Sequence, residues 1–291
     1  MIVVALIGIG YWGSKLKRYI EENPNFRIKH ICDSKSDLNE VWNDEEVKAV
    51  INATTNKFHY EISKEALLSG KHVLSEKPVA MRVDECRDLK IIADKRGLVI
   101  LTDYTYTFSK SLKRAVNMVE DGEIGSLLGL EMSVRHLGRF GGGSVYWLLG
   151  SHMLSVLDMF VPLDSLKFSK RDIVVFRNIP ETGTIFFEND EIAGQIVVSL
   201  NYPGKEARIV LYGEGGSIIY DPLSKYTLEI TRYKRLRWAV AEKIPKEKEC
   251  FYINEGDNLE YAIQYLYDCI KGKSDSNIER ALAITRIIEG F

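Results

Sequence analysis

Residues 2–13 read IVVALIGIGYWG, an apolar run rich in β-branched side chains that ends in the glycine pattern Gly8-x-Gly10-x-x-Gly13. This combination is typical of a strand, tight turn and helix that bind a dinucleotide, because the glycines allow the turn, admit a pyrophosphate and let the helix pack closely. The free N–H groups at the start of the helix then face an anion. We therefore expect Gly8, Gly10 and Gly13, with Tyr11 and Trp12 between them, to bind the cofactor.

A second strand candidate, FRIKHIC, is followed by Asp33, twenty residues after Gly13. An acid at this spacing suits a hydrogen bond to the adenosine ribose, and its charge repels a 2′-phosphate. This favours NAD over NADP. Ser34 and Lys35 come next, and the lysine can offset part of the repulsion, so NADP stays open. We expect Asp33 and Ser34 to bind the cofactor.

Length and composition bound the class of protein. At 291 residues and 45% hydrophobic, the chain has room for two domains. A formal net charge of -2 offers no global attraction to nucleic acid or to an anionic membrane. No apolar run reaches the length of a spanning helix, and the start has no leader-like pattern. The four cysteines form no CxxC pair, so we expect neither a metal site nor a disulfide scaffold, and a cytoplasmic protein.

Two halves of the chain differ in hydrophobic period. Residues 1–120 alternate between strand-like and helix-like segments, which predicts an α/β Rossmann domain with a parallel sheet. From about 126 to 233 the period is mostly two, which predicts a second domain, 121–291, built on an open, mostly antiparallel sheet. One helical insert lies near 145–160. The segment 243–249 is expected to be a solvated loop.

The tail has helical spacing at 257–271 and 278–288, and these helices can pack back on the first domain. The antiparallel sheet should leave one face uncovered by its own helices. An apolar sheet face is normally buried against another subunit, so we expect a homodimer or homotetramer formed through this sheet.

Four blocks of sequence, in order, resemble the glucose-fructose oxidoreductase and inositol 2-dehydrogenase family, often written Gfo/Idh/MocA. The first is the turn GIGYWG, and the second is 51–56, INATTN, with His59. The third is 70–78, GKHVLSEKP, which is similar to the EKP signature of the family. The fourth is the glycine run 141–143 followed by 150–152, GSH. EKP at this offset from the glycine turn is the specific part.

The resemblance implies a cofactor loop and a catalytic pair. Residues lying along the cofactor would be Thr54, Thr55, Asn56, His59, Glu76, Lys77 and Pro78. Lys77 and His152 would face the nicotinamide, and a cis bond would precede Pro78. These residue types suit the oxidation of a secondary alcohol, because a lysine stabilises an alkoxide-like oxygen and an imidazole exchanges its proton near neutral pH.

One position departs from the family pattern. An aspartate is usual four residues before the histidine, and this chain has Leu148 there. Asp158, six residues after His152, points away from that face of a helix and is a poor replacement. Either the substrate needs only Lys77 and His152, or the activity is reduced or lost.

The substrate is expected to be sugar-like: a sugar, a cyclitol or a nucleotide-activated sugar, as the resemblance implies. Residues that could line its pocket, besides Leu148 and His152, are Tyr104, Tyr106, Lys110, Arg135, Arg139 and Tyr146. Their positive charges are compatible with a phosphate or carboxylate on the ligand.

Three functions remain open at this point. The leading one is an oxidoreductase that moves a hydride between NAD(P) and a sugar-like alcohol. A second is a lyase or hydrolase that uses bound NAD for transient oxidation. A third, motivated by Leu148, is a catalytically silent NAD-binding sensor or assembly subunit.

The basic and aromatic run 233–238 resembles a nucleic-acid patch, but alternation on a sheet also produces it, and we expect no nucleic-acid partner.

Overall fold

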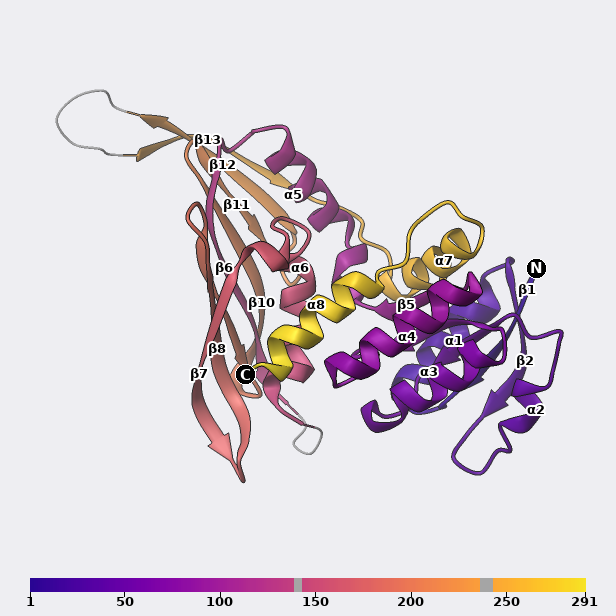
Figure 1. Cartoon of the computed structure of the whole chain (residues 1–291). Helices are drawn as coiled ribbons and strands as arrows, with labels where there is room; N and C mark the ends of the chain where they lie inside the picture. Colours follow the sequence, from indigo (N-terminus) through magenta and orange to yellow (C-terminus); the bar gives the residue numbers. More distant parts are fainter. Residues whose placement is uncertain (139–142, 236–242) are drawn as a thin grey trace. The chain divides into compact units, whose positions relative to one another are not determined.

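The computed structural model describes residues 1–138, 143–235 and 243–291 (Figure 1). The chain divides into two compact units, Met1–Thr105 with Gly256–Gly290, and Tyr106–Glu255 with Phe291. The boundary therefore differs from the one expected near residue 120. Helix α5 (Lys110–Glu120) belongs to the second unit, where Ser111 Oγ lies 2.7 Å from Thr227 Oγ1. The tail helices belong to the first unit.

The first unit contains a parallel five-stranded sheet with the order β2-β1-β3-β4-β5, as the alternating pattern predicted. Its strands are β1 (Ile2–Ile7), β2 (Phe26–Cys32), β3 (Ala49–Asn52), β4 (His72–Glu76) and β5 (Ile100–Asp103). The strands β1, β3 and β5 are buried throughout, which is usual for a parallel sheet covered on both faces. Because all strands run in one direction, their carboxyl ends share one edge of the sheet.

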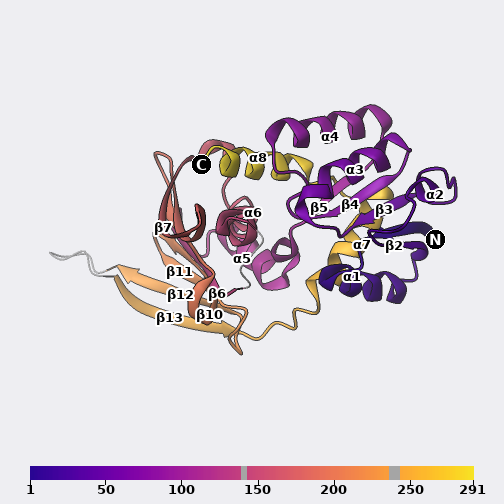
Figure 2. The ribbon, with the colours of Figure 1, turned by 90° about the horizontal axis from the view of Figure 1, so that it is seen from below.

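Helices cover both faces of this sheet (Figure 2). One layer consists of α1 (Tyr11–Glu22) and α7 (Asn258–Ile270), whose apolar side chains share a core with β1, β3, Leu74 and Leu101. The other layer consists of α3 (His59–Leu68), α4 (Val83–Arg96) and α8 (Ile278–Glu289). The short helices of this unit are α2 (Asn39–Trp42) and η1 (Asn56–Phe58).

The second unit contains an eight-stranded sheet with the order β13-β12-β11-β10-β6-β9-β8-β7. Its strands are β6 (Leu127–Leu137), β7 (Lys167–Phe176), β8 (Ile179–Glu188), β9 (Ala193–Ser199), β10 (Asn201–Gly213), β11 (Gly216–Tyr220), β12 (Leu228–Arg235) and β13 (Lys243–Phe251). All neighbouring pairs are antiparallel except β6 and β9, which are parallel. This confirms the expected mostly antiparallel sheet.

The expectation of a solvated loop at 243–249 is wrong, because this segment is part of β13. Its charged side chains form cross-strand pairs with β12, among them Lys248 Nζ to Glu229 Oε1 at 2.7 Å and a contact of Arg232 with Glu249. Opposite charges on facing strands stabilise pairing without any apolar pattern. A sequence without hydrophobic alternation can therefore still form an edge strand.

Helices of the second unit lie on one face of its sheet. They are α5, the π-helical turn η3 (Tyr146–Gly150) and α6 (Ser151–Leu157), with short turns η2 (Thr105–Phe108) and η4 (Leu163–Ser165). Within residues 106–138, 143–235 and 243–255, no helix of this unit covers the other face, which we call the open sheet face (Figure 2). None of the helices that the structure describes is both long and apolar enough to cross a bilayer.

Candidate cofactor and substrate site

The three glycines of the turn have different surroundings. Gly8 has φ +94°, and a Cβ there would lie 2.6 Å from the carbonyl oxygen of Ala53. A Cβ on Gly13 would lie 1.9 Å from the carbonyl oxygen of Gly8, so both positions exclude any side chain. A Cβ on Gly10 would meet no atom within 4 Å. Gly10 is also the N-cap of α1 and forms no side-chain cap bond, which leaves the helix N-terminus available to an anion.

A cavity of about 720 Å³ opens beside this turn. Its volume is within the range of small-molecule and cofactor sites. Of the expected cofactor residues, it is lined by Gly8, Gly10, Tyr11, Trp12, Asp33, Ser34, Thr54 and Thr55. It is also lined by residues that the sequence did not single out, including Ser36, Leu38, Phe58 and Ile62. The open space over Gly10 and the exposed N-terminus of α1 fit a dinucleotide.

Asp33 lies at one end of this cavity, directly after β2. Its Oδ1 accepts hydrogen bonds from the backbone N of Lys35 at 2.9 Å and from Ser36 Oγ at 3.1 Å. These bonds lower the pKa of the Asp33 carboxyl, with the Lys35 backbone bond the largest cause. The carboxylate is therefore held in position and charged at neutral pH.

The loop after β3 is organised by buried polar side chains. Asn52 accepts a hydrogen bond from Thr54 Oγ1 at 2.7 Å and donates one to the carbonyl oxygen of His59 at 3.0 Å. The ring of His59 is 1% exposed, with Nδ1 2.6 Å from the oxygen of Pro78 and Nε2 3.1 Å from that of Thr54. Burial lowers the pKa of His59. His59 thus supports the loop from below, and its ring does not line the cavity.

The EKP segment follows β4 at the carboxyl edge of the sheet. The bond between Lys77 and Pro78 is cis, as the resemblance implied. Lys77 is half-buried, and desolvation lowers its pKa to about 8, against the opposing influence of Glu76 and Asp103. Burial also raises the pKa of Glu76 to about 7. Lys77 can therefore exchange a proton close to neutral pH.

His152 lies on α6, one turn after Leu148. Every residue from 145 to 157 is buried except Leu148 and His152, which remain partly exposed. These two side chains therefore share the side of the helix that does not pack on the sheet. The Tyr106 ring lies beside His152, with ring centroids 5.3 Å apart, and burial raises the pKa of Tyr106. Oδ1 of Asp158 accepts a hydrogen bond from the backbone N of Leu163 at 3.3 Å, at the other end of α6.

Arg135, another expected substrate residue, is not on the same face of the sheet as His152. Met132 and Val134 are buried on the face of β6 that contacts α6. Arg135 alternates with them along the strand, so its side chain points to the open sheet face. Its guanidinium bonds both carboxylate oxygens of Glu206, at 2.8 and 2.9 Å. Arg135 and His152 thus lie on opposite faces of the sheet, and we no longer assign Arg135 to the substrate site.

Tyr146 is 2% exposed and donates a hydrogen bond to Asp172 Oδ1 at 2.7 Å, so it is a packing residue of the second unit. Tyr104 is also buried, in the first unit. Lys110 Nζ bonds the carbonyl oxygen of Asn254 at 3.3 Å. Arg139, Gly141, Gly142 and residues 236–238 lie outside the described residues. Among the residues that are described, no group of three or more His, Cys, Asp or Glu could hold a metal ion.

Residues 2–104 match the family model GFO_IDH_MocA, described as "Oxidoreductase family, NAD-binding Rossmann fold". The chain carries the NAD-binding domain of the Gfo/Idh/MocA oxidoreductases. The match ends close to Thr105, where the first of the two segments of the first unit also ends. Together with the geometry of the three glycines and the cavity beside them, this match shows that the domain binds NAD(P).

Individual relatives to which this chain is similar have different activities. A 2,7-anhydro-N-acetylneuraminate hydratase from Mediterraneibacter gnavus is 29% identical over 138 residues, 43% of this chain and 37% of the relative. A 1,5-anhydro-D-fructose reductase from Ensifer adhaerens is 33% identical over 92 residues, 32% of this chain and 28% of the relative. The chain thus matches well under half of each of these two relatives.

A solved structure extends the similarity to the whole fold. KijD10, a 3-ketoreductase from Actinomadura kijaniata in complex with TDP-benzene and NADP, has a TM-score of 0.82. The two chains are 16% identical, and the alignment covers 99% of this chain and 96% of KijD10. At this identity the likeness concerns the fold, and it includes the second unit that the family model does not reach.

A further residue that the sequence did not single out is Asp103, the last residue of β5. It is 1% exposed, and Glu76 is its partner in the register of β4 and β5. A signal was available, because Asp103 closely follows the apolar run LVIL, as Glu76 follows HVL. The carboxyl ends of neighbouring parallel strands meet at the ligand-binding edge of such sheets.

Proposed function

We propose that this protein is an NAD(P)-dependent oxidoreductase that moves a hydride to or from a secondary alcohol carbon of a sugar, cyclitol or nucleotide-activated sugar. The observation that carries the proposal is Lys77, a half-buried lysine at the carboxyl edge of the Rossmann sheet with a pKa lowered to about 8. A lysine that titrates near the working pH suits acid–base chemistry.

Each residue in this proposal has a distinct role. A bound nicotinamide supplies the site that gives or accepts hydride. The Lys77 ammonium stabilises negative charge on the reacting oxygen, and His152 gives or takes the hydroxyl proton. With Leu148 one turn before it, His152 acts without a neighbouring carboxylate at that position. Tyr106, which lies against the His152 ring, restricts its orientation.

Relatives support a sugar-like substrate. The reductase of 1,5-anhydro-D-fructose acts on a sugar ketone, and KijD10 is a 3-ketoreductase solved with a TDP compound. Both names describe reduction of a ketone. We propose the same direction and substrate class for this chain, with a nucleotide-activated ketosugar as the first candidate to test.

A second candidate function is a lyase or hydratase reaction that uses bound NAD for transient oxidation. The 2,7-anhydro-N-acetylneuraminate hydratase among the relatives favours it. Such an enzyme returns the cofactor to its starting state in each turnover. Net change of NADH absorbance with substrate therefore separates the two candidates.

The proposal is tested by following NADH and NADPH oxidation with a panel of ketosugars and TDP-ketosugars. With an active substrate, Lys77→Ala and His152→Ala are each expected to lower kcat on the order of 10²-fold or more, as loss of acid–base help does. The controls are Lys95→Ala, an exposed lysine in the last turn of α4, and His136→Ala on β6. Unchanged rates in the Lys77 and His152 variants would refute their roles.

If no substrate of the panel oxidises NADH while the cofactor still binds, the oxidoreductase proposal fails. The catalytically silent, NAD-binding subunit then becomes the better account. Binding is measured separately, by fluorescence titration with NADH, so loss of the cofactor is not mistaken for loss of chemistry.

A further inference from the structure

Glu76 and Asp103 are the terminal residues of two neighbouring parallel strands, β4 and β5. They are direct partners in the register, two residues beyond the partners Leu74 and Leu101. Side chains two residues apart on a strand share a face, so both carboxyl groups point to the layer of α1 and α7 that contains Leu74 and Leu101. Neighbouring strands are about 4.8 Å apart, which brings the two carboxyl groups close together.

Asp103 has an unusual environment for a carboxyl group. The residue is 1% exposed, and neither carboxylate oxygen has a hydrogen-bond partner within the described part of the chain. A buried carboxylate without hydrogen bonds is costly unless it is neutral or faces a positive charge. The charged groups that affect it are Glu76, Lys77 and Asp257, two of them acidic and one basic.

Asp257 is already engaged elsewhere. Its side chain caps α7 by accepting a hydrogen bond from the backbone N of Leu259 at 3.0 Å, and it also accepts one from the Tyr19 hydroxyl. The charge balance of the cluster therefore depends on Glu76, Asp103 and Lys77. Two close carboxyl groups cannot both ionise easily at low dielectric, whereas one carboxylate beside one ammonium is favourable.

We propose that Glu76 and Asp103 hold one proton between them near neutral pH, and that Asp103 is a positioning residue that keeps the Lys77 amine charged as the pH rises. The inference rests on the proposed role of Lys77 in the reaction. When the shared proton leaves, the two carboxyl groups carry two negative charges, and the second charge stabilises the protonated, ammonium form of Lys77. The directions of the pKa changes agree with this proposal. Burial raises the pKa of Asp103, and the charges of Glu76 and Asp103 act to raise the pKa of Lys77, against the lowering by desolvation.

The test measures the protonation of Lys77 directly, without a substrate. Protein labelled with [ε-13C]lysine is titrated by NMR, and the Lys77 signal is identified from its absence in Lys77→Arg. Asp103→Asn keeps the shape of the side chain and removes its charge. We expect it to lower the pKa of Lys77 by roughly half a unit or more. The matched control is Asp94→Asn, an exposed acid on α4, which should leave the Lys77 signal unchanged.

A second measurement keeps the inference testable if Asp103→Asn does not fold. In the unaltered protein labelled with [γ-13C]aspartate, the Asp103 carboxyl should still be titrating above pH 6. Glu76→Gln should move that titration to lower pH. An Asp103 carboxyl that is fully ionised from pH 5 to 9, or a Lys77 pKa that is unchanged or higher in Asp103→Asn, overturns the inference.

Failure of this inference can be told apart from failure of the proposed function. If Lys77 shifts in Asp103→Asn and the pH–rate profile of ketosugar reduction moves with it, both are supported. If Lys77 shifts and the profile does not, the inference stands and the role of Lys77 is refuted. If Lys77 does not shift, the inference is refuted and the activity of Lys77→Ala still decides the function.

Discussion

The imidazole of His59 and the carbonyl oxygen of Pro78 lie 2.6 Å apart, which ties the first turn of α3 to the segment that carries Lys77. The other ring nitrogen lies 3.1 Å from the oxygen of Thr54, a residue of the cavity wall. One buried side chain therefore connects the cofactor loop after β3 with the loop after β4. A change at His59 should affect both.

Replacing His59 should destabilise the first unit. Neutral His59 has one ring N–H, which can donate to only one of the two carbonyl oxygens. His59→Ala removes this buried hydrogen bond, and we expect a loss of about 2 kcal/mol in the free energy of unfolding. The measurement is urea denaturation at pH 7. His30→Ala is the control, because His30 pairs with Asp44 in a partly exposed position and its loss should cost about 1 kcal/mol or less. Equal losses in the two variants would contradict the bridging role.

The pH dependence of stability gives an independent check on His59. Burial lowers the pKa of His59 in the folded protein, whereas His59 in the unfolded chain has the ordinary histidine pKa of about 6.5. As the pH falls below about 6.5, the unfolded chain therefore takes up a proton that the folded protein does not, and this favours unfolding. The stability contributed by neutral His59 should therefore be present above that pH and fall as the pH drops from 7 toward 5. His59→Gln, which does not titrate, should flatten this slope in denaturation curves. An unchanged slope would show that other groups cause it.

The glycine turn offers a pair of variants that separate folding from cofactor binding. Gly13→Ala forces a Cβ against the carbonyl oxygen of Gly8, and we expect it to cost about 3 kcal/mol or more of stability. Gly10→Ala meets open space, so its cost should be about 0.5 kcal/mol.

The same Gly10→Ala variant should bind NADH at least roughly tenfold more weakly, because its methyl group enters the space that a pyrophosphate occupies in this fold. Thermal denaturation and NADH fluorescence titration measure the two effects. Unchanged NADH affinity in Gly10→Ala would place the dinucleotide elsewhere.

Cofactor preference is expected to depend on the charge of Asp33. Asp33→Asn retains an oxygen that can accept the bond from the Lys35 backbone, and it removes the charge that repels a 2′-phosphate. We expect the ratio of the NADP and NAD dissociation constants to fall about tenfold in calorimetry. Asp37→Asn, on the same loop, should leave the ratio unchanged. Tighter binding of NADP than of NAD by the unaltered protein would reject the preference for NAD.

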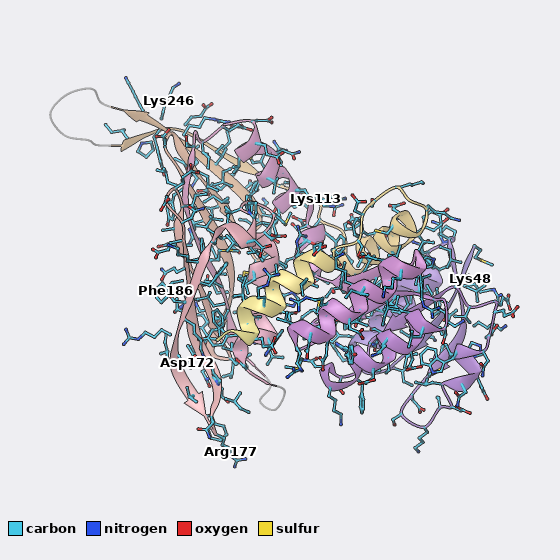
Figure 3. The ribbon with its side chains drawn as sticks, in the orientation of Figure 1. Lys48, Lys113, Asp172, Arg177, Phe186 and Lys246 are labelled. Atoms are coloured by element: carbon cyan, nitrogen blue, oxygen red, sulfur yellow. The ribbon has the colours of Figure 1, made fainter. Side chains whose placement is uncertain are left out.

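The open sheet face is expected to be a surface through which copies of the chain associate. Phe186 lies on this face, opposite α6, and 41% of it is exposed (Figure 3). Tyr212, another exposed aromatic residue of the face, lies on β10. We propose that a second copy of the chain buries these side chains.

Light scattering at micromolar concentration should then give a dimer or tetramer. Phe186→Lys should shift the mass to that of the monomer, while Tyr252→Lys, an exposed aromatic residue after β13, should not. A monomeric parent protein would remove the basis for this prediction.

The sequence predicted the parallel half of the fold because its signals are local. The run IVVALI requires burial on both faces, and the glycines at 70 and 97 follow the ends of the helices α3 and α4. It did not predict β13, because that strand is stabilised by charge pairs with β12, a distant partner. The position of α5 in the second unit was missed for the same reason: a hydrophobic stripe indicates burial without specifying the partner.

The candidate site divides in a similar way. Residue type and spacing indicated the glycine turn and Asp33, since backbone geometry and charge at these points are properties of short segments. The EKP segment was indicated by its resemblance to a family signature. Only the tertiary structure decided that Arg135 faces away from His152, that the ring of His59 is buried beneath the loop, and that Asp103 lies beside Glu76. These relations depend on the register of strands far apart in the chain, and the face to which a side chain points changes with a shift of a single residue.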